Sequence, residues 1–267
     1  MPAKSRLGQN FLRDHNAIQR IVSALGPLSS RTVVEIGPGQ GAITSLLATQ
    51  AQHLIAVEYD PELVSSLQSH FPSTSESPNV TIVHRDILEF DFATAAREAG
   101  QPLLVAGNLP YYITSPILLR LAANAEHLDR AVLMVQREVA DRVTAQPGTR
   151  DYGLLTVTMQ LYGSTESLFT LPPGAFSPPP EVHSTVFRWT FAPRIQQLGI
   201  EEAPFIHFLK QSFAQKRKTL ANNLRAVGQP TEKITAAFTA ASIPPQARAE
   251  TLSLEQFATL WRVLSAS

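Results

Sequence analysis

The sequence contains no cysteine among its 267 residues. The absence of thiols excludes a disulfide framework, a thiolate zinc site and any mechanism that uses a cysteine nucleophile. No stretch approaches the roughly 18 consecutive apolar residues of a membrane span, and residues 1–14 lack the apolar core of a secretory signal. We therefore expect a cytoplasmic protein that does not interact with membranes.

Net charge is also absent, because 22 Lys and Arg residues balance 22 Asp and Glu residues. Hydrophobic residues make up 44% of the chain and charged residues 16%, which is typical of a globular protein and not of a disordered one. The charges are unevenly placed, since residues 205–225 contain five basic residues and no acid. This segment predicts a surface that binds a polyanion on one side of the protein, although a solvated helix face would look the same.

Short apolar runs alternate with helical patterns through the first half of the chain. The strand-like runs are 32–36, 53–57, 80–84, 102–106 and 131–135, and helical patterns near 42–50, 61–70, 92–99 and 115–124 lie between them. Runs that are continuously apolar suit strands that are buried on both faces. The alternation therefore predicts an α/β fold built on a parallel sheet.

The pattern changes in the second half of the chain. Residues 164–171 and 182–191 flank a Pro-rich stretch and predict an antiparallel addition at one edge of the sheet. From Glu201 onward the pattern is helical. We therefore place a domain boundary near residues 193–200.

A glycine-rich loop follows the first predicted strand. Gly37 and Gly39 lie at a strand-to-helix turn, where the backbone can approach a ligand closely. Glu58 ends the second predicted strand and can accept hydrogen bonds from a ribose, and Asp86 follows the third and can accept from an adenine amine. This arrangement serves both NAD and S-adenosylmethionine. Glu35 favours the latter, because a carboxylate beside a pyrophosphate would be repulsive.

The segment Asn108, Leu109, Pro110 and Tyr111 follows the fourth predicted strand. An adenine amine is a poor nucleophile, because its lone pair is delocalised into the ring. The amide oxygen of Asn108 and a main-chain carbonyl at Leu109, which Pro110 restrains, can accept its two hydrogens and localise that lone pair. Tyr111 offers a flat face on which the base can stack. These residue types together predict methyl transfer to adenine by alignment and electrostatics.

With these segments in place, the sequence resembles the ribosomal RNA adenine N6,N6-dimethyltransferases of the small-subunit type (the KsgA/RsmA group). The resemblance covers nearly the whole chain. Beyond Glu58 and Asp86, it is carried by residues 4–12, 35–41, 108–111, 136–140, 176–182, 215–224 and 248–252.

The resemblance implies a Rossmann-like class I methyltransferase domain with a seven-stranded mixed sheet over residues 1–193. It also implies a small all-helical, RNA-binding C-terminal domain over residues 200–267. S-adenosylmethionine would be the methyl donor. The substrate would be two adjacent adenines in the 3′-terminal hairpin loop of 16S rRNA, each methylated twice, within an immature 30S subunit. The enzyme would act as a monomer and without a metal.

Further site residues follow from the same motifs. The cofactor pocket would contain Gln9, Asn10, Leu12, Gly37, Gly39, Glu58, Asp86, Ile87 and Asn108. Phe176 would stack on the target base opposite Tyr111. The basic residues Lys216, Arg217 and Lys218 are the main candidates for contact with RNA phosphates, and Arg137 is a further one.

Three alternatives stay open at this point. One is the 23S rRNA adenine dimethyltransferase of the antibiotic-resistance type, which shares the pocket motifs. Another is a ribosome-assembly factor whose catalysis is dispensable. The third is a nicotinamide-dependent oxidoreductase, because the glycine loop alone also fits a dinucleotide.

Overall fold

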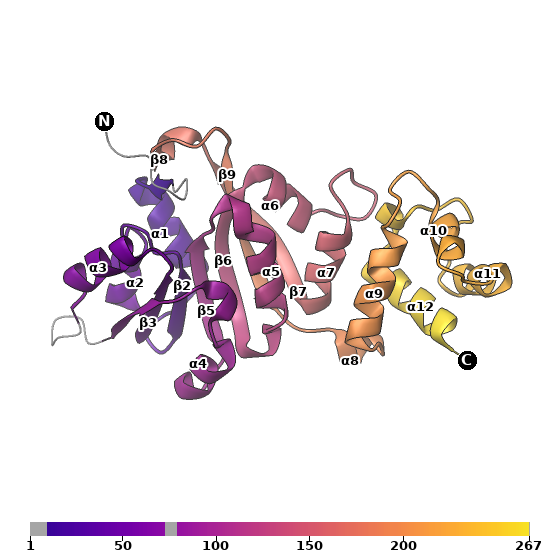
Figure 1. Ribbon diagram of the computed structural model, residues 1–267, viewed down its shortest axis with the longest axis horizontal. Helices are drawn as coiled ribbons and strands as arrows, with labels where there is room; N and C mark the ends of the chain where they lie inside the picture. Colours follow the sequence, from indigo (N-terminus) through magenta and orange to yellow (C-terminus); the bar gives the residue numbers. More distant parts are fainter. Residues whose placement is uncertain (1–9, 73–78, 267) are drawn as a thin grey trace. The chain divides into compact units, whose positions relative to one another are not determined.

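The computed structural model describes residues 10–72 and 79–266, which form two compact units (Figure 1). The first unit comprises the described residues up to Ala140 together with Glu166–Phe191. The second comprises Asp141–Thr165 together with the described residues from Ala192 onward. Gln9, a predicted cofactor residue, lies outside the described residues.

A seven-stranded sheet forms the centre of the first unit, in the order β4-β3-β2-β5-β6-β9-β7. The strands are β2 (Thr32–Ile36), β3 (His53–Glu58), β4 (Val80–His84), β5 (Leu103–Asn108), β6 (Leu128–Gln136), β7 (Gly163–Leu171) and β9 (Ser184–Phe191). Strands β2 to β6 pair in parallel, and β9 pairs antiparallel with β6. The mixed sheet confirms the expected Rossmann-like α/β fold.

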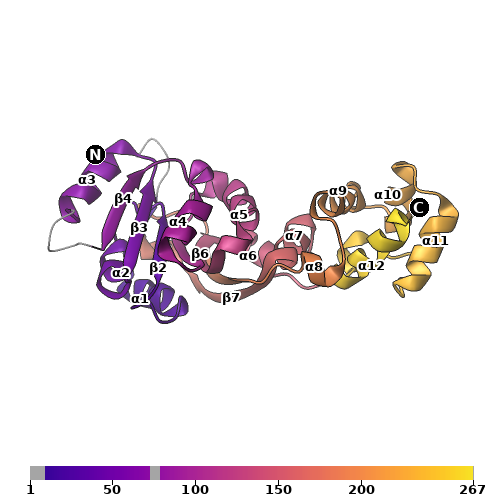
Figure 2. The same ribbon diagram turned by 90° about the horizontal axis from the view of Figure 1, so that it is seen from below.

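Helices cover both faces of this sheet. They are α1 (His15–Ala24), α2 (Thr44–Gln50), α3 (Pro61–His70), α4 (Phe92–Ala99), α5 (Thr114–Ala122) and α6 (Arg137–Val143). Figure 2 shows α1 and α2 on one face and α4 and α5 on the other. Right-handed crossovers require this division, because the chain moves outward from β2 to β4 and then returns to β5. The strand order therefore reverses between β2 and β5, where ligands bind in such sheets.

A small second sheet joins two segments that are far apart in the sequence. Strand β1 (Phe11–Leu12) pairs antiparallel with β8 (Phe176–Ser177), with Leu12 opposite Phe176. The Arg13 amide extends this pairing by donating to the Ala175 carbonyl at 2.8 Å. Leu12 and Phe176 are both buried in the same core cluster. The pairing thus holds the start of the described chain against the segment between β7 and β9.

The second unit is helical. Its helices are α7 (Leu154–Tyr162), α8 (Ile195–Leu198), α9 (Glu202–Ser212), α10 (Leu220–Ala226), α11 (Thr231–Ala240) and α12 (Leu254–Ser265). Phe205, Phe208 and Phe257 form part of its core. Within the described residues, no helix of either unit is long and apolar enough to cross a membrane.

Residues 141–165 belong to this helical unit, whereas the sequence placed them in the first domain, residues 1–193. The Tyr152 hydroxyl donates to the Leu252 carbonyl at 2.7 Å, and the Tyr162 hydroxyl donates to Glu202 at 2.6 Å. Burial and these bonds raise the pKa of both tyrosines. Long-range contacts of this kind explain the difference, because no local pattern announces them.

Candidate active site

A cavity of about 990 Å³ opens at the carboxyl ends of β2, β3 and β5. Its walls come from four segments: β1, the glycine loop after β2, the ends of β3 and β4, and the segment that follows β5. The predicted residues that line it are Asn10, Leu12, Gly37, Gly39, Glu58, Asp86, Ile87, Asn108, Leu109, Pro110 and Tyr111. The structure therefore brings residues from four predicted motifs to one site.

The glycine loop has a backbone that other residues would adopt only with strain. Gly37 has φ +62° and Gly39 has φ +58°, both in the left-handed region. A Cβ atom at Gly39 would also lie 3.0 Å from the Phe11 ring. The Gly37 amide donates to the Val57 carbonyl at 3.0 Å, which fixes the loop to the end of β3. Glycine is thus required at position 39 both for conformation and for the close approach of β1.

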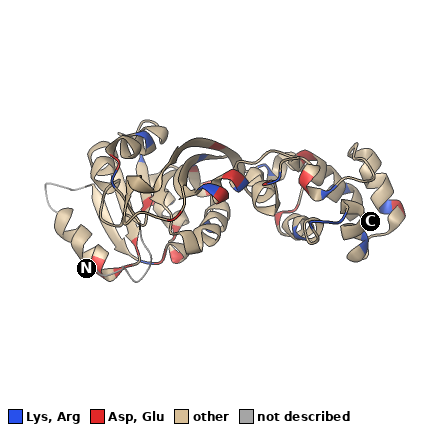
Figure 3. Ribbon diagram, turned by 90° about the horizontal axis from the view of Figure 1, so that it is seen from above, with Lys and Arg blue, Asp and Glu red and all other residues tan. Residues whose placement is uncertain are grey.

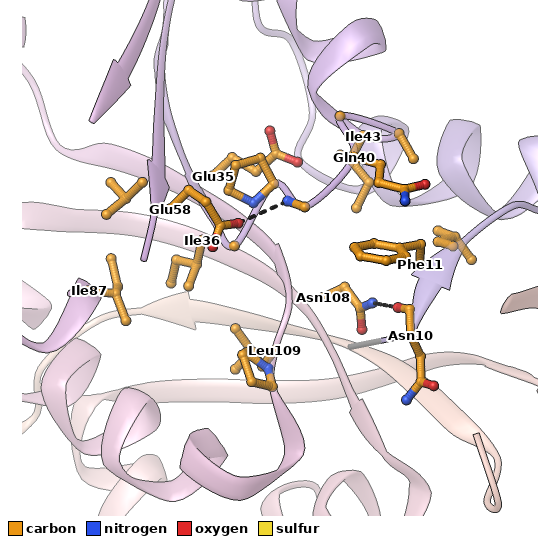
Figure 4. A pocket seen from close by; sticks show the side chains of 18 of the residues that line it. Asn10, Phe11, Glu35, Ile36, Gln40, Ile43, Glu58, Ile87, Asn108 and Leu109 are labelled. Carbon is orange, nitrogen blue, oxygen red and sulfur yellow. Dashed lines mark hydrogen bonds between the residues drawn. The ribbon is translucent and has the colours of Figure 1, made fainter. Parts of the chain in front are cut away.

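Glu58 lies at the end of β3 and is 3% exposed. Its Oε2 accepts from the Gly39 amide at 3.1 Å, and its Oε1 accepts from the amides of Tyr59 and Asp60 at 2.9 and 3.0 Å. Figure 4 shows the bond to Gly39. A carboxylate offers about four acceptor positions, so Glu58 supports the glycine loop and keeps one acceptor position for a ligand hydroxyl.

Glu35 is a buried carboxyl group directly before the glycine loop. It is 1% exposed, lines the cavity, and its Oε2 has no hydrogen-bond partner among the described residues. Burial raises the pKa of Glu35 to about 8, a neighbouring Glu58 adds to this increase, and Thr44 opposes it. An unpaired buried carboxyl at this position suits a ligand that carries a positive charge.

Asp86 and Ile87 follow β4 and both line the cavity. The Oδ1 of Asp86 accepts from the Leu88 amide at 2.9 Å and thereby caps the short helix η1 (Ile87–Glu89). The helix-capping role that any Asp in this position can have is therefore present. It employs one oxygen of the carboxylate, and the residue still faces the same cavity as Glu58.

Asn108 ends β5, and its amide is held by a main-chain group of β1's neighbour. Its Nδ2 donates to the Asn10 carbonyl at 2.9 Å. Figure 4 shows this bond and shows the amide oxygen pointing away from Asn10. The following residues are also fixed: the Leu109 amide donates to the Met134 carbonyl at 2.9 Å, and the Pro110 carbonyl accepts from Thr114 Oγ1 at 3.0 Å.

Two aromatic residues predicted to stack on the base lie in different surroundings. Tyr111 lines the cavity, and its hydroxyl shares a 2.8 Å hydrogen bond with the buried Ser184 hydroxyl. Phe176 is not a lining residue of the cavity; it is 5% exposed and packs in the core cluster with Leu12. The structure therefore does not bring Phe176 and Tyr111 together around one pocket.

Two exposed tyrosines at the cavity were missed by the sequence analysis. Tyr59 and Tyr112 are 61% and 62% exposed, and both line the cavity. Burial raises the pKa of Tyr112, and the nearby acid Asp86 contributes. The available signal was that each follows directly after a predicted site residue, Glu58 or Tyr111.

Gly107 sets the distance between the glycine loop and Asn108. It lies opposite Ile36, the last residue of β2, in the parallel pairing of β2 with β5. A Cβ atom at Gly107 would lie 2.8 Å from the Ile36 carbonyl oxygen. The two strands can therefore run this close only because position 107 has no side chain.

The predicted RNA-binding residues lie elsewhere. Arg137 is the first residue of α6. Lys216, Arg217 and Lys218 are exposed in the turn between α9 and α10, in the second unit, which we call the basic turn. The buried Asn223 holds this turn by donating from Nδ2 to the Ser212 carbonyl at 2.7 Å. Figure 3 shows basic residues along the loops of the second unit as well as on its helices.

The cavity fits S-adenosylmethionine. The glycine loop offers an open backbone, Glu58 an acceptor for a ribose, and Ile87 and Leu109 apolar contacts. The buried, unpaired Glu35 suits a cationic ligand and disfavours a pyrophosphate. These observations argue against NAD, the cofactor of the oxidoreductase alternative.

Comparison with known proteins agrees with this site. The family model described as "Ribosomal RNA adenine dimethylase" matches residues 2–265. The chain is 55% identical over 261 residues to a protein of Acidobacterium capsulatum named "Ribosomal RNA small subunit methyltransferase A", covering 98% of this chain and 91% of that protein. It is 49% identical over 272 residues to a protein of the same name from Koribacter versatilis, covering 98% and 94%.

Two solved structures share the fold. The 23S rRNA methyltransferase ErmE has a TM-score of 0.74 and 27% sequence identity, over 96% of this chain and 100% of that one. A dimethyladenosine transferase from Plasmodium falciparum has a TM-score of 0.77 at 22% identity, over 94% and 95%. The similarity in both cases extends over both units of this chain.

Proposed function

The chain belongs to the ribosomal RNA adenine dimethylase family, and on this basis we propose that it transfers methyl groups from S-adenosylmethionine to N6 of adenines in small-subunit ribosomal RNA. The substrate is two adjacent adenines of the 3′-terminal hairpin loop of 16S rRNA, in an immature 30S subunit. The enzyme works in the cytoplasm as a monomer. Relatives at 55% and 49% identity that carry the small-subunit name support this choice over the 23S type, whose structural relative shares 27%.

The orientation of Asn108 is the observation that carries this proposal. Its Nδ2 is bonded to a carbonyl, so its Oδ1 is the end of the amide that is directed away from β1, at the cavity. An oxygen acceptor there can take a hydrogen bond from the N6 amine of adenine. That bond localises the lone pair of the amine and aligns it for attack.

Neighbouring residues complete the alignment. Pro110 restrains the backbone so that the Leu109 carbonyl can accept the second hydrogen of the amine. Tyr111, held by its bond to Ser184, provides a face for the base. Base stacking on an aromatic side chain contributes about 1–3 kcal/mol. The target base must leave its stack to reach this site, which suits a hairpin loop with splayed bases.

The cofactor is held by the glycine loop, Glu58, Asp86 and Ile87. When bound, it supplies a methyl group that is already activated on a sulfonium sulfur. The chain therefore needs no strong base or metal ligand for this step. Glu35, which is buried and unpaired, places a carboxyl beside the positive charge of the cofactor.

The second unit provides contacts to RNA phosphates. The basic turn is exposed and stands in a segment of five basic residues without an acid, residues 205–225. Contacts between lysine or arginine and phosphates release counterions and make the affinity depend on salt. Arg137 is a further candidate for such a contact on the first unit.

The direct test is methylation of purified small ribosomal subunits that lack the adenine methyl groups. With S-adenosylmethionine labelled in its methyl group, we expect label in two adjacent adenines near the 3′ end of 16S rRNA. The large subunit serves as the matched control. Label in 23S rRNA and none in 16S rRNA would overturn the proposal in favour of the antibiotic-resistance type.

An assembly role with dispensable catalysis needs its own test. Asn108→Ala removes the acceptor and leaves the exposed surface of the protein unchanged. If cells that carry only this variant mature their small subunits normally, binding and not methylation is the essential activity. If maturation fails as it does without the protein, the methyl transfer itself is required.

A further inference from the structure

The contact that orients Asn108 comes from the main chain. Asn108 Nδ2 donates to the carbonyl of Asn10, which is 98 residues away in the sequence. The Asn10 side chain points away from Asn108 in Figure 4. The identity of the residue at position 10 therefore matters less for this contact than the position of its backbone.

A carbonyl oxygen can only accept a hydrogen bond. The end of the amide that faces Asn10 must therefore be the nitrogen, and the opposite end must be the oxygen. If the amide turned over, two oxygen atoms would face each other, and the nitrogen would present donors to an amine that is itself a donor. The Asn10 carbonyl thus selects the rotamer in which Asn108 can accept from adenine.

The backbone at Asn10 is held in place by β8. Phe11 and Leu12 of β1 pair with Ser177 and Phe176, and the Arg13 amide donates to the Ala175 carbonyl at 2.8 Å. Leu12 and Phe176 are 3% and 5% exposed, so core packing supports the pairing from below. A shift of β8 would therefore move the carbonyl that orients Asn108.

Strand β1 also contacts the glycine loop. The Phe11 ring packs where a Cβ atom of Gly39 would stand, and Arg13 Nη2 donates to Gln40 Oε1 at 2.7 Å. The same two-residue strand thus touches the cofactor loop on one side and reaches the catalytic amide through the preceding carbonyl. Few other paths connect β8 to the reacting atoms so directly.

We propose that β1 is a positioning strand for methyl transfer: the Asn10 main-chain carbonyl, held by the β1–β8 pairing, sets the amide of Asn108 with its oxygen toward the target amine. This inference rests on the proposed function. It assigns Asn10 a role through its backbone, and it assigns Phe176 and its neighbours in β8 a role in support of β1.

The first test compares Arg13→Pro with Arg13→Ala. Both variants lose the side-chain bond to Gln40, but only the proline lacks the amide that donates to Ala175. The residue before it, Leu12, is already in a strand, which a following proline favours. The difference between the two variants therefore reports the β1–β8 hydrogen bond.

We expect kcat of Arg13→Pro to be about 3- to 10-fold below that of Arg13→Ala, as for the loss of one orienting hydrogen bond. The KM for RNA and the Kd for S-adenosylmethionine should be the same in the two variants. A merely structural weakening would instead lower the amount of folded protein and leave kcat per folded molecule equal. Equal kcat values in two folded variants would overturn the proposal.

A spectroscopic measurement observes the amide directly and needs no substrate. The chain has seven asparagines, so ¹⁵N-asparagine labelling gives a simple set of side-chain amide signals, and the signal missing in Asn108→Ala identifies residue 108. We expect its amide protons to exchange more slowly with solvent in Arg13→Ala than in Arg13→Pro. Equal exchange rates would overturn the inference while leaving the methylation assay, and thus the proposed function, untouched.

A second variant covers the case in which Arg13→Pro does not fold. Replacing Phe11 by its α-hydroxy analogue keeps the ring and converts the Asn10 carbonyl from an amide into an ester, which is a weaker acceptor. We again expect a lower kcat and faster exchange of the Asn108 amide protons than in the wild type. A folded ester variant with wild-type values for both would overturn the inference.

Discussion

The cavity of the first unit and the basic turn of the second are built in opposite ways. Around the cavity, Glu58 and Glu35 are almost fully buried, and Asn108 is bonded to the backbone of a distant segment. In the basic turn, Lys216, Arg217 and Lys218 are exposed, and one buried residue, Asn223, holds the loop beneath them.

This difference separates geometry from charge. The cavity fixes the direction of a few polar atoms, as alignment of a nucleophile requires. The turn presents positive charges on side chains that extend into water, as attraction to phosphates requires. Substitutions in the cavity should therefore change turnover or stability, and substitutions in the turn should change the salt dependence of RNA binding.

Phe176 decides on which side of this comparison a predicted RNA contact falls. It is buried in the core, so we expect Phe176→Ala to lower the free energy of unfolding by about 3–5 kcal/mol, the usual effect of removing a buried phenylalanine side chain. Urea unfolding measures this change. Tyr112→Ala, at a ring that is 62% exposed, is the control and should have little effect. Reduced turnover at wild-type stability would favour the stacking role instead.

Asn108→Ala should affect turnover alone. Loss of a preorganised electrostatic contact to the reacting group lowers kcat by about 100- to 1000-fold. Steady-state methylation at saturating RNA and S-adenosylmethionine measures this loss. The exposed Asn16 of α1 offers a matched control, because Asn16→Ala removes the same groups away from Asn108. If the salt dependence of RNA binding changed as well, the separation of geometry from charge would fail.

Glu35 should give the first unit a stability that depends on pH. Its pKa is about 8 in the folded protein against 4.5 in the unfolded chain, so between these values the folded state holds a proton that the unfolded state releases. Stability therefore falls as pH rises through this window. From pH 5 to pH 8 we expect the wild type to lose on the order of 3 kcal/mol relative to Glu35→Gln.

Urea unfolding of both proteins at the two pH values measures this effect. Glu62→Gln, at an exposed acid of α3, serves as the control and should follow the wild type. Parallel curves for the wild type and Glu35→Gln would mean that the Glu35 carboxyl is not held protonated. The cavity would then tolerate a buried charge without a ligand.

Neutralising the basic turn should have the smallest effect, and only on binding. Replacing Lys216, Arg217 and Lys218 with Ala should reduce the slope of log affinity against log salt by about 2 to 3, if each side chain contacts one phosphate. The matched control removes three other exposed charges of the second unit, Lys210, Arg225 and Lys233. Equal reductions in both triple variants would show that total charge matters and the turn does not.

The sequence predicted the central sheet well because buried parallel strands are continuous apolar runs. The five predicted runs correspond to β2, β3, β4, β5 and β6 within a few residues. The glycine loop and the segment after β5 were recognisable because their chemistry requires particular residue types.

Other features have no such local signal. The place of residues 141–165 in the helical unit depends on bonds such as that from Tyr152 to the Leu252 carbonyl. The contact of Asn108 with Asn10 uses a main-chain carbonyl, which every residue type has. A phenylalanine after a turn, such as Phe176, fits a binding site and a core equally well until the fold is known.

Gly107 has one further consequence. The carbonyl of Ile36 stands where any side chain at position 107 would begin, and the next residue along β5 is Asn108. The separation between donor loop and acceptor amide is thus built into the spacing of two neighbouring strands. Engineering this enzyme toward other nucleobases would have to reshape the outer walls of the cavity, because the framework itself offers no adjustable part at that point.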